Sequence, residues 1–302
     1  MYCTVQLDSS NGKHEFDIAR FLVMGHSPTP RCIIVRHGQT EWSKSGQYTG
    51  LTDLPLTDYG VGQMLRTGES IFSNNRFINP DHITYIFTSP RTRAKQTIEL
   101  VLKPLSEEQR SKIKVIVDND LREWEYGDYE GLLTKEIVEL RKSRGLDKAR
   151  PWNIWRDGCE NGETTEEVGL RLSRVIARIQ NLHKKHQEQG IPSDIMVFAH
   201  GHALRYFAAI WLRLGEEKEC ITAFSKQKVK SYEEDESVVP YVEITKFRHL
   251  VDNPFFLLDA GGIGVLSYAH HSIDEPALDL AGAFISPPEE ESQHAPVPNK
   301  NY

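Results

Sequence analysis

Short apolar runs alternate with longer amphipathic segments along most of this chain. Runs rich in β-branched and aromatic residues predict strands at Cys32–Val35, Ile83–Thr88, Ile113–Val117 and Ile195–Ala199. Similar but weaker patterns predict later strands near Tyr241–Phe247 and Phe255–Leu258, and we expect both to extend the same sheet. Each of the first four runs is long enough for a buried strand and too short for a helix of ordinary length.

Helical spacing of apolar residues characterises the segments between these strands. It predicts helices over about 57–77, 91–105, 164–190 and 203–214. The third helix has the clearest end signals, because Thr164 to Glu167 read as a capping box and Gly190 follows the last periodic residue. The ends of this third helix are therefore predicted from its capping residues as well as from the spacing of its apolar residues.

Alternating strands and helices predict an α/β fold. With right-handed crossovers, the pattern gives a mostly parallel central sheet covered by helices on both faces, a three-layer sandwich. We expect a single domain over residues 31–275, preceded by a poorly ordered N-terminal extension over 1–30 that includes a variable stretch, 1–23. The acidic, proline-rich residues 276–302 are expected to form a solvated tail.

Composition restricts the function classes. Among 302 residues, 36 Lys and Arg stand against 43 Asp and Glu, and the net charge of -7 argues against a nucleic-acid-binding surface. No apolar run approaches the roughly 18 residues of a membrane span, so a membrane partner is not expected. The four cysteines have no paired spacing, which indicates reduced thiols and a cytoplasmic protein, with the nucleus as a second compartment. The composition leaves a homo-oligomer open.

Two histidine motifs stand where predicted strands end. Arg36-His37-Gly38 follows the first strand, and His200-Gly201-His202 follows the fourth. In an open α/β sheet, functional side chains collect at the carboxyl ends of the strands. Two imidazoles and an arginine around one crevice suit an anionic substrate such as a phosphate ester.

Two further segments supply what phosphoryl transfer needs, which is positive charge around the phosphoryl oxygens, an in-line nucleophile and an acid for the departing oxygen. Arg93 lies near the start of a predicted helix, whose dipole also favours an anion. Glu123 follows Leu121 and precedes Trp124, two apolar neighbours suited to excluding water. A single histidine after a strand is more often structural, but the ordered set favours catalysis.

Together these four segments resemble the histidine phosphatase superfamily, which includes phosphoglycerate mutases and many phosphatases. The resemblance implies the histidine phosphatase (phosphoglycerate mutase-like) fold. It also implies that His37 is a nucleophile that becomes a phosphohistidine and that Arg36 and Arg93 stabilise the phosphoryl charge. Glu123 would then be the proton donor, and His200 a second contact to the phosphoryl group.

Four other residues match positions near the substrate in this family. Tyr48, Thr49 and Tyr126 fall where members touch the substrate, and Arg205 could meet a second phosphate. Both tyrosines could instead be packing residues, and the arginine could pair on a helix surface. No cofactor and no metal are expected, since arginines already supply the positive charge.

Within the superfamily, the segments Trp152–Gly158 and Asp259–Gly264 most resemble fungal sugar bisphosphatases. This implies a small sugar bisphosphate as the partner and a role in ribose synthesis. The segment Glu160–Thr164 replaces the arginine- and proline-rich stretch of the mutases, which favours water as the acceptor, while Ser43 stands where many members have Asn. Three alternatives stay open: a mutase, a phosphatase for another sugar phosphate, and a noncatalytic binding module.

Overall fold

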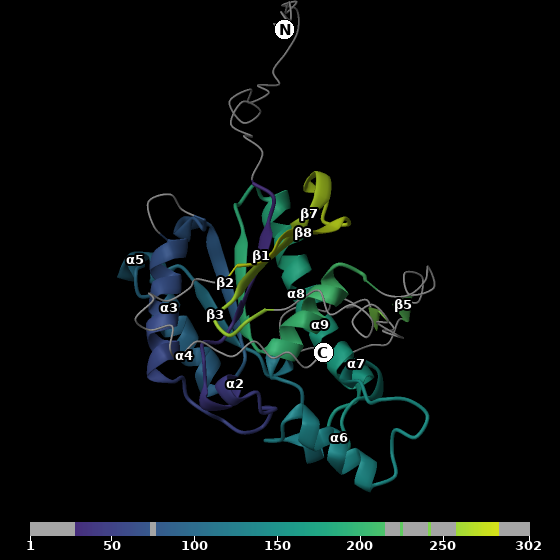
Figure 1. Cartoon of the computed structure of the whole chain (residues 1–302). Coiled ribbons are helices and arrows are strands. Elements are labelled where there is room, and N and C mark those ends of the chain that lie inside the picture. The colour runs from purple at the N-terminus through teal and green to yellow at the C-terminus, as the bar shows by residue number, and fades with distance from the viewer. Residues whose placement is uncertain (1–27, 73–76, 215–223, 226–240, 243–257, 284–302) are drawn as a thin grey trace, which may run out of the picture.

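The computed structural model describes residues 28–72, 77–214, 224–225, 241–242 and 258–283. Its centre is a six-stranded sheet with the strand order β3-β2-β4-β1-β7-β8 (Figure 1). These strands are β1 (Arg31–Arg36), β2 (Ile83–Thr88), β3 (Lys114–Val117), β4 (Asp194–Ala199), β7 (Ile263–Tyr268) and β8 (Pro276–Ala283). The first four pair in parallel, whereas β7 and β8 are antiparallel to their neighbours, so the mostly parallel sheet is confirmed.

Helices cover both faces of this sheet. The α-helices are α2 (Glu41–Ser45), α3 (Asp58–Ile71), α4 (Thr92–Val101), α5 (Glu107–Ser111), α6 (Thr134–Ser143), α7 (Ile154–Asp157), α8 (Thr165–Glu188) and α9 (Gly201–Trp211). In Figure 1, α3 and α4 lie on one side of the sheet and α8 and α9 on the other. The expected three-layer α/β sandwich is confirmed.

Alternation along the strands produces two separate cores. In β1, Ile33 and Val35 pack with the residues of α3 and α4, whereas Cys32 and Ile34 pack with those of α8 and α9. Successive strand side chains point to opposite faces, so an unbroken apolar strand fills both cores at once. This is why the buried strands could be read from the sequence as continuous apolar runs.

Helix ends follow the chemistry of their caps. The Thr164 hydroxyl accepts from the Glu167 N–H at 3.2 Å, and the Glu167 carboxylate accepts from the Thr164 N–H at 2.8 Å, which confirms the predicted capping box. Helices α3 and α4 end at Ile71 and Val101, earlier than expected. The long predicted helices therefore begin close to the right residue and end too late.

Two expectations for the C-terminal part are wrong. Residues 276–283 are not tail but the edge strand β8, in which Pro276 is paired with Tyr268. Proline fits there because it is the first residue of an edge strand, where its missing N–H breaks no central ladder. Likewise, β6 (Tyr241–Val242) does not extend the central sheet but pairs with β5 (Phe224–Ser225).

The remaining terminal expectations are not tested. Residues 1–27 of the expected N-terminal extension and residues 284–302 of the expected tail lie outside the described residues. So do residues 243–247 of the first late strand and 255–257 of the second, while Leu258 is described and belongs to no strand. The division of the chain into extension, domain and tail stays a prediction at both ends.

A buried histidine predicts acid sensitivity of the fold. His183 of α8 is 0% exposed, its Nδ1 lies 2.8 Å from the Tyr268 hydroxyl, and burial lowers the pKa of its ring to about 3. As the pH falls below about 6.5, the unfolded chain takes up a proton that the native state does not bind. Stability should therefore decrease by about 1.4 kcal/mol per pH unit between pH 6 and 4 on account of this group.

Urea unfolding at several pH values measures this loss. A His183→Gln variant can still bond the Tyr268 hydroxyl but cannot take up the proton, so its free energy of unfolding should vary less steeply with pH. Equal slopes in the two proteins would show that His183 does not contribute.

Candidate active site

The two predicted histidines leave the sheet side by side. Strands β1 and β4 are parallel neighbours, with the last residue of β1, Arg36, opposite the last residue of β4, Ala199. The residue that follows each strand is a histidine, His37 after β1 and His200 after β4. The His37 N–H donates to the Ala199 carbonyl at 3.1 Å, and the His37 and His200 ring centroids are 5.1 Å apart. The prediction that both rings meet at the carboxyl edge of the sheet is confirmed.

His37 is held as a neutral ring. It is 6% exposed, and its Nδ1 lies 2.8 Å from the Gly38 carbonyl oxygen. A carbonyl can only accept, so Nδ1 carries the proton and Nε2 keeps its lone pair. Burial, together with the Arg93 and Arg36 cations, holds the pKa of His37 well below its usual range. The ring therefore has the protonation state of a nucleophile.

Arg93 lies in the first turn of α4 and is 0% exposed. Its Nη1 and Nη2 donate to the carbonyl oxygens of Thr52 at 3.0 Å and Thr49 at 3.1 Å. Its Nε donates to Nδ1 of His200 at 3.2 Å. Each of its three nitrogens therefore donates one hydrogen bond, and these bonds fix the guanidinium next to both histidine rings.

His200 is the second neutral ring of the site. Because its Nδ1 accepts from Arg93, its proton lies on Nε2, which donates to the Ser89 hydroxyl at 2.7 Å. Burial and the Arg93 cation hold the pKa of His200 well below its usual range. Ser89 was not among the expected site residues, although its place directly after β2, at the same sheet edge, was a usable signal.

Glu123 lies at the N-terminus of α9. One carboxylate oxygen accepts from the N–H groups of Trp124 and Ala203, both at 2.9 Å, and the other accepts from the His202 N–H at 3.0 Å. These three hydrogen bonds fix the orientation of the carboxyl group at the end of the helix. Leu121 and Trp124 are fully buried, so the expected exclusion of water beside the carboxylate is present.

Arg36 reaches the same helix end from β1. Its Nη1 donates to the Leu258 carbonyl at 2.8 Å, and its guanidinium lies against Gly201, where an added Cβ would stand 3.1 Å from Cζ. A Cβ at Gly201 would therefore require the guanidinium to shift by a few tenths of an ångström. The structure therefore gathers five predicted residues around one site: Arg36, His37, Arg93, Glu123 and His200.

The four other expected residues, Tyr48, Thr49, Tyr126 and Arg205, lie beside this group. Tyr48 packs edge-on against Tyr126 with centroids 4.9 Å apart, and the carbonyl of Thr49 accepts from Arg93. The Arg205 guanidinium lies 4.9 Å from the centre of the Trp155 ring, in a cation–π contact.

His202, two residues after His200, connects these aromatic residues to the site. The Tyr126 hydroxyl lies 2.7 Å from its Nδ1, Tyr48 stacks on it at 5.6 Å, and its N–H holds Glu123. We did not expect this contact role for His202. The repeated histidine of the His-Gly-His motif was its signal.

Ser43 has a local role. Its hydroxyl accepts from the Thr40 N–H at 2.8 Å, and the Thr40 hydroxyl accepts from the Ser43 N–H at 3.2 Å, so the two cap α2. The ring of His37 is oriented by Gly38 instead.

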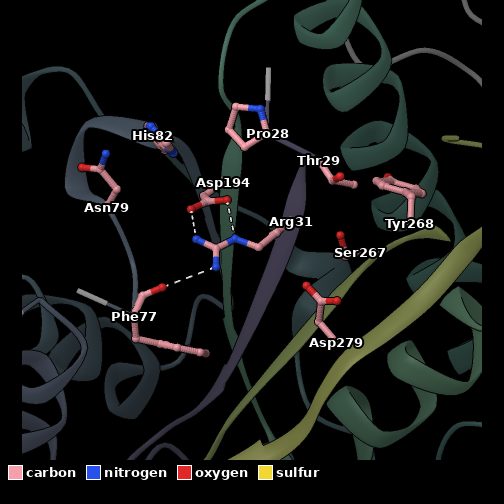
Figure 2. Close-up of a pocket in the computed structure, with 10 residues that line it drawn as sticks. All are labelled: Pro28, Thr29, Arg31, Phe77, Asn79, His82, Asp194, Ser267, Tyr268 and Asp279. Carbon is pink, nitrogen blue, oxygen red and sulfur yellow. Dashed lines mark hydrogen bonds and ion pairs between the residues drawn. The ribbon is translucent and has the colours of Figure 1, made fainter. Parts of the chain in front are cut away.

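A separate pocket lies at the opposite end of β1, as Figure 2 shows. It is lined by Arg31, the first residue of that strand, which donates to both carboxylate oxygens of Asp194, at 2.9 Å and 2.5 Å. Arg31 and His37 are six residues apart in extended chain, which separates the pocket from His37 by roughly 20 Å. The pocket is therefore distinct from the histidine site.

Within the described ranges, no group of three or more His, Cys, Asp or Glu side chains is placed to hold a metal ion. The metal-free site expected from the sequence stays a prediction. The described helices also include none that is long and apolar enough to cross a membrane.

Several known proteins are similar to this chain in sequence or in fold. The sedoheptulose 1,7-bisphosphatase of Saccharomyces cerevisiae is 79% identical over 271 residues, covering 90% of this chain and 99% of that protein. An acid phosphatase of Mycobacterium tuberculosis is 30% identical over 184 residues, covering 61% of this chain and 76% of that protein. A solved structure of a Mycobacterium tuberculosis open reading frame product superposes with a TM-score of 0.56 at 25% identity, covering 84% and 97% of the two chains.

A family model supports the same assignment. The model described as histidine phosphatase superfamily (branch 1) matches residues 32–233, which include His37, Arg93, Glu123 and His200. The match covers well over half of the chain and contains each of the four motifs from which the resemblance was read. This protein belongs to the histidine phosphatase superfamily.

Proposed function

We propose that this chain is a sugar-bisphosphate phosphatase that hydrolyses sedoheptulose 1,7-bisphosphate to sedoheptulose 7-phosphate through a phosphohistidine. The observation that carries the proposal is the 79% identity to the yeast sedoheptulose 1,7-bisphosphatase over 271 residues. The product would feed the synthesis of ribose 5-phosphate. The neutral His37 beside two arginines supports the same chemistry independently.

In the first step, Nε2 of His37 attacks the phosphorus in line with the sugar oxygen. The N–P bond forms as the P–O bond to the sugar breaks, and the departing oxygen takes a proton from the carboxyl group of Glu123. The phosphoryl group then resides on His37, and Glu123 is a carboxylate that the helix N–H groups stabilise.

In the second step, water attacks the phosphohistidine. Glu123 takes the proton from the water, the N–P bond breaks, and its electron pair returns to Nε2 of His37. Both groups regain their starting protonation states, so the cycle is balanced without an added co-reactant.

Charge stabilisation falls to the two arginines. The transferring phosphoryl group carries negative charge on three equatorial oxygens, and Arg36 and Arg93 supply charge-assisted hydrogen bonds to them. The same cations disfavour protonation of His37 and so keep it nucleophilic. We propose His200 as a further contact to the phosphoryl group.

Phosphate release from a panel of sugar mono- and bisphosphates, measured with a chelator present, tests the function. We expect rapid turnover of sedoheptulose 1,7-bisphosphate and slow turnover of monophosphates. Preference for phosphotyrosine or simple monophosphates would overturn the substrate assignment. Phosphate shuffling that requires a bisphosphorylated primer would instead indicate a mutase, and no turnover of any ester a noncatalytic module.

We further propose that Arg205 contacts the second phosphate, with Tyr48, Thr49 and Tyr126 near the sugar. Replacing Arg205 by Met keeps the stem and removes the charge. Loss of one charge-assisted contact should raise KM for the bisphosphate about 10-fold to 100-fold and leave KM for a monophosphate nearly unchanged. Arg178→Met on α8, where the arginine pairs with Asp118, is the matched control. An equal rise in KM for both substrates would contradict this role.

We also propose where the enzyme is located in the cell and what it binds. The unpaired spacing of the cysteines supports a cytoplasmic protein, with the nucleus as a second compartment. We propose a small sugar bisphosphate as its partner, without a nucleic acid, a membrane, a metal or a cofactor. Self-association into a homo-oligomer is compatible with these properties.

A further inference from the structure

A buried ion pair lies directly behind the loop that carries Glu123. Arg171 of α8 is 2% exposed, and Glu163, just before that helix, is 6% exposed. Nε and Nη2 of Arg171 donate to the two carboxylate oxygens of Glu163, each at 2.8 Å. This parallel arrangement fixes both side chains in orientation as well as in distance.

The other N–H groups of Arg171 hold the loop. Nη1 donates to the carbonyl oxygens of Asp120 at 2.8 Å and Arg122 at 2.7 Å, and Nη2 also donates to the carbonyl of Glu123 at 3.2 Å. A guanidinium has five N–H donors, and here each of the five has an acceptor. Three of them serve the main chain that leads to and includes Glu123.

Glu163 holds the loop on the other side of Glu123. Its carboxylate accepts from the Glu125 N–H at 3.0 Å, and its own N–H donates to the Glu125 carbonyl at 2.8 Å. Its carbonyl accepts from the indole N–H of Trp124 at 2.8 Å. The two segments touch so closely that a Cβ on Gly162 would stand 2.1 Å from the Glu125 oxygen.

We propose that the Glu163–Arg171 pair is a positioning device for the proton donor Glu123. The pair fixes the main chain before and after Glu123, and this directs the carboxyl group to the end of α9 beside the histidine rings. Neither member has a role in bond making, so both are positioning residues. The inference rests on the proposed function, in which Glu123 protonates the departing sugar oxygen.

Comparing two leaving groups distinguishes a positioning role from a purely structural one, because loss of a purely structural contact should slow both substrates equally. A sugar alkoxide is strongly basic and needs a proton as it departs, whereas 4-nitrophenolate departs without one. The ratio kcat/KM covers the steps up to departure of the leaving group from the phosphorus. A misplaced donor should therefore lower kcat/KM for the sugar bisphosphate and leave that for 4-nitrophenyl phosphate nearly unchanged.

Two single variants test the pair. Glu163→Gln keeps the shape but removes the charge, and Arg171→Lys keeps the charge but cannot serve five acceptors. A displacement of about 1 Å can cost about 100-fold in rate. We expect kcat/KM for sedoheptulose 1,7-bisphosphate to fall about 10-fold to 100-fold and that for 4-nitrophenyl phosphate to fall less than about 3-fold.

Asp194→Asn is the matched control. Asp194 is also a buried carboxylate with a bidentate arginine, Arg31, but the pair lies at the other end of β1 (Figure 2). Its loss should change kcat/KM for the two substrates by the same factor. The double variant Glu163→Leu/Arg171→Met removes both charges together, which buried pairs often tolerate, and serves if the single variants do not fold. Arg122 also donates to Glu163, at 2.6 Å, and in the double variant it keeps its contact to Glu125 at 3.1 Å.

Glu123→Gln separates the two ideas under test. If that variant affects both substrates equally, the proton-donor assignment in the proposed function fails. If it is selective for the sugar bisphosphate while the variants of Glu163 and Arg171 affect both substrates equally, the positioning inference is overturned. Selective loss in all of them supports both.

Discussion

Replacing His37 by alanine is expected to lower phosphate release from sedoheptulose 1,7-bisphosphate by about 10⁵-fold, because no other group can form the phosphorylated intermediate. Arg93 and His200 remain beside the vacated position, but they can only bind the ester. Steady-state phosphate release measures the loss. Rapid quenching with radiolabelled substrate should detect an acid-labile phosphoenzyme in the unaltered protein and none in the variant.

His186→Ala is the control for this experiment. His186 is a half-buried histidine of α8 that bonds Ser193 near the amino ends of the strands. Its loss should leave phosphate release and the phosphoenzyme unchanged. Undiminished release by His37→Ala, with normal folding by circular dichroism, would remove His37 as the nucleophile.

Replacing Arg93 by lysine is expected to lower kcat by about 10³-fold, the lower end of the range for arginines that stabilise phosphoryl transfer. An ammonium is a point charge and cannot donate at once to two carbonyls and a ring nitrogen while facing a phosphate. The contact of Arg93 to Nδ1 of His200 would also be lost, so that ring could change its tautomer. Single-turnover measurement of phosphoenzyme formation isolates the affected step.

Arg141→Lys is the matched control for Arg93→Lys. Arg141 is also buried and donates to three oxygen atoms, but these are the two carboxylate oxygens of Asp147, at 2.7 Å and 2.6 Å, and the Tyr129 hydroxyl. It should reduce stability more than turnover. If Arg93→Lys retained kcat within about tenfold, the stabilisation of the phosphoryl charge would have to come from elsewhere.

Much of the fold and of the candidate site could be predicted from short sequence patterns. The apolar runs before His37 and His200 identified two buried strands, and the general rule for parallel sheets then placed both rings at one edge. Thr164 marked the start of α8 because a capping box depends only on residues three apart. Such features are local in sequence and so can be read from it.

Other features depend on partners far away in the chain. Strand β7 exists because it pairs with β1, with Leu266 opposite Cys32, and no short-range pattern encodes that partner. Strand β8 looked like a solvated tail because Pro276 and Asp279 suit an edge strand as well as an open chain. The segment around Glu163 was read only as a family marker, and its pairing with Arg171 appears only when α8 is in place.

The catalytic histidines are positioned by the paired strands β1 and β4, whereas the residues proposed near the sugar lie in loops. The catalytic residues and the residues that select the substrate can therefore change independently in evolution. Backbone ladders set the spacing of the two rings, with Arg36 opposite Ala199, while Tyr48 and Tyr126, which we propose near the sugar, lie in connecting segments. Mutation can rebuild these segments without disturbing the reaction centre. One ancestral scaffold could thus diversify into enzymes as different as an acid phosphatase and a sugar bisphosphatase, and grafting such a segment offers a route to new selectivity.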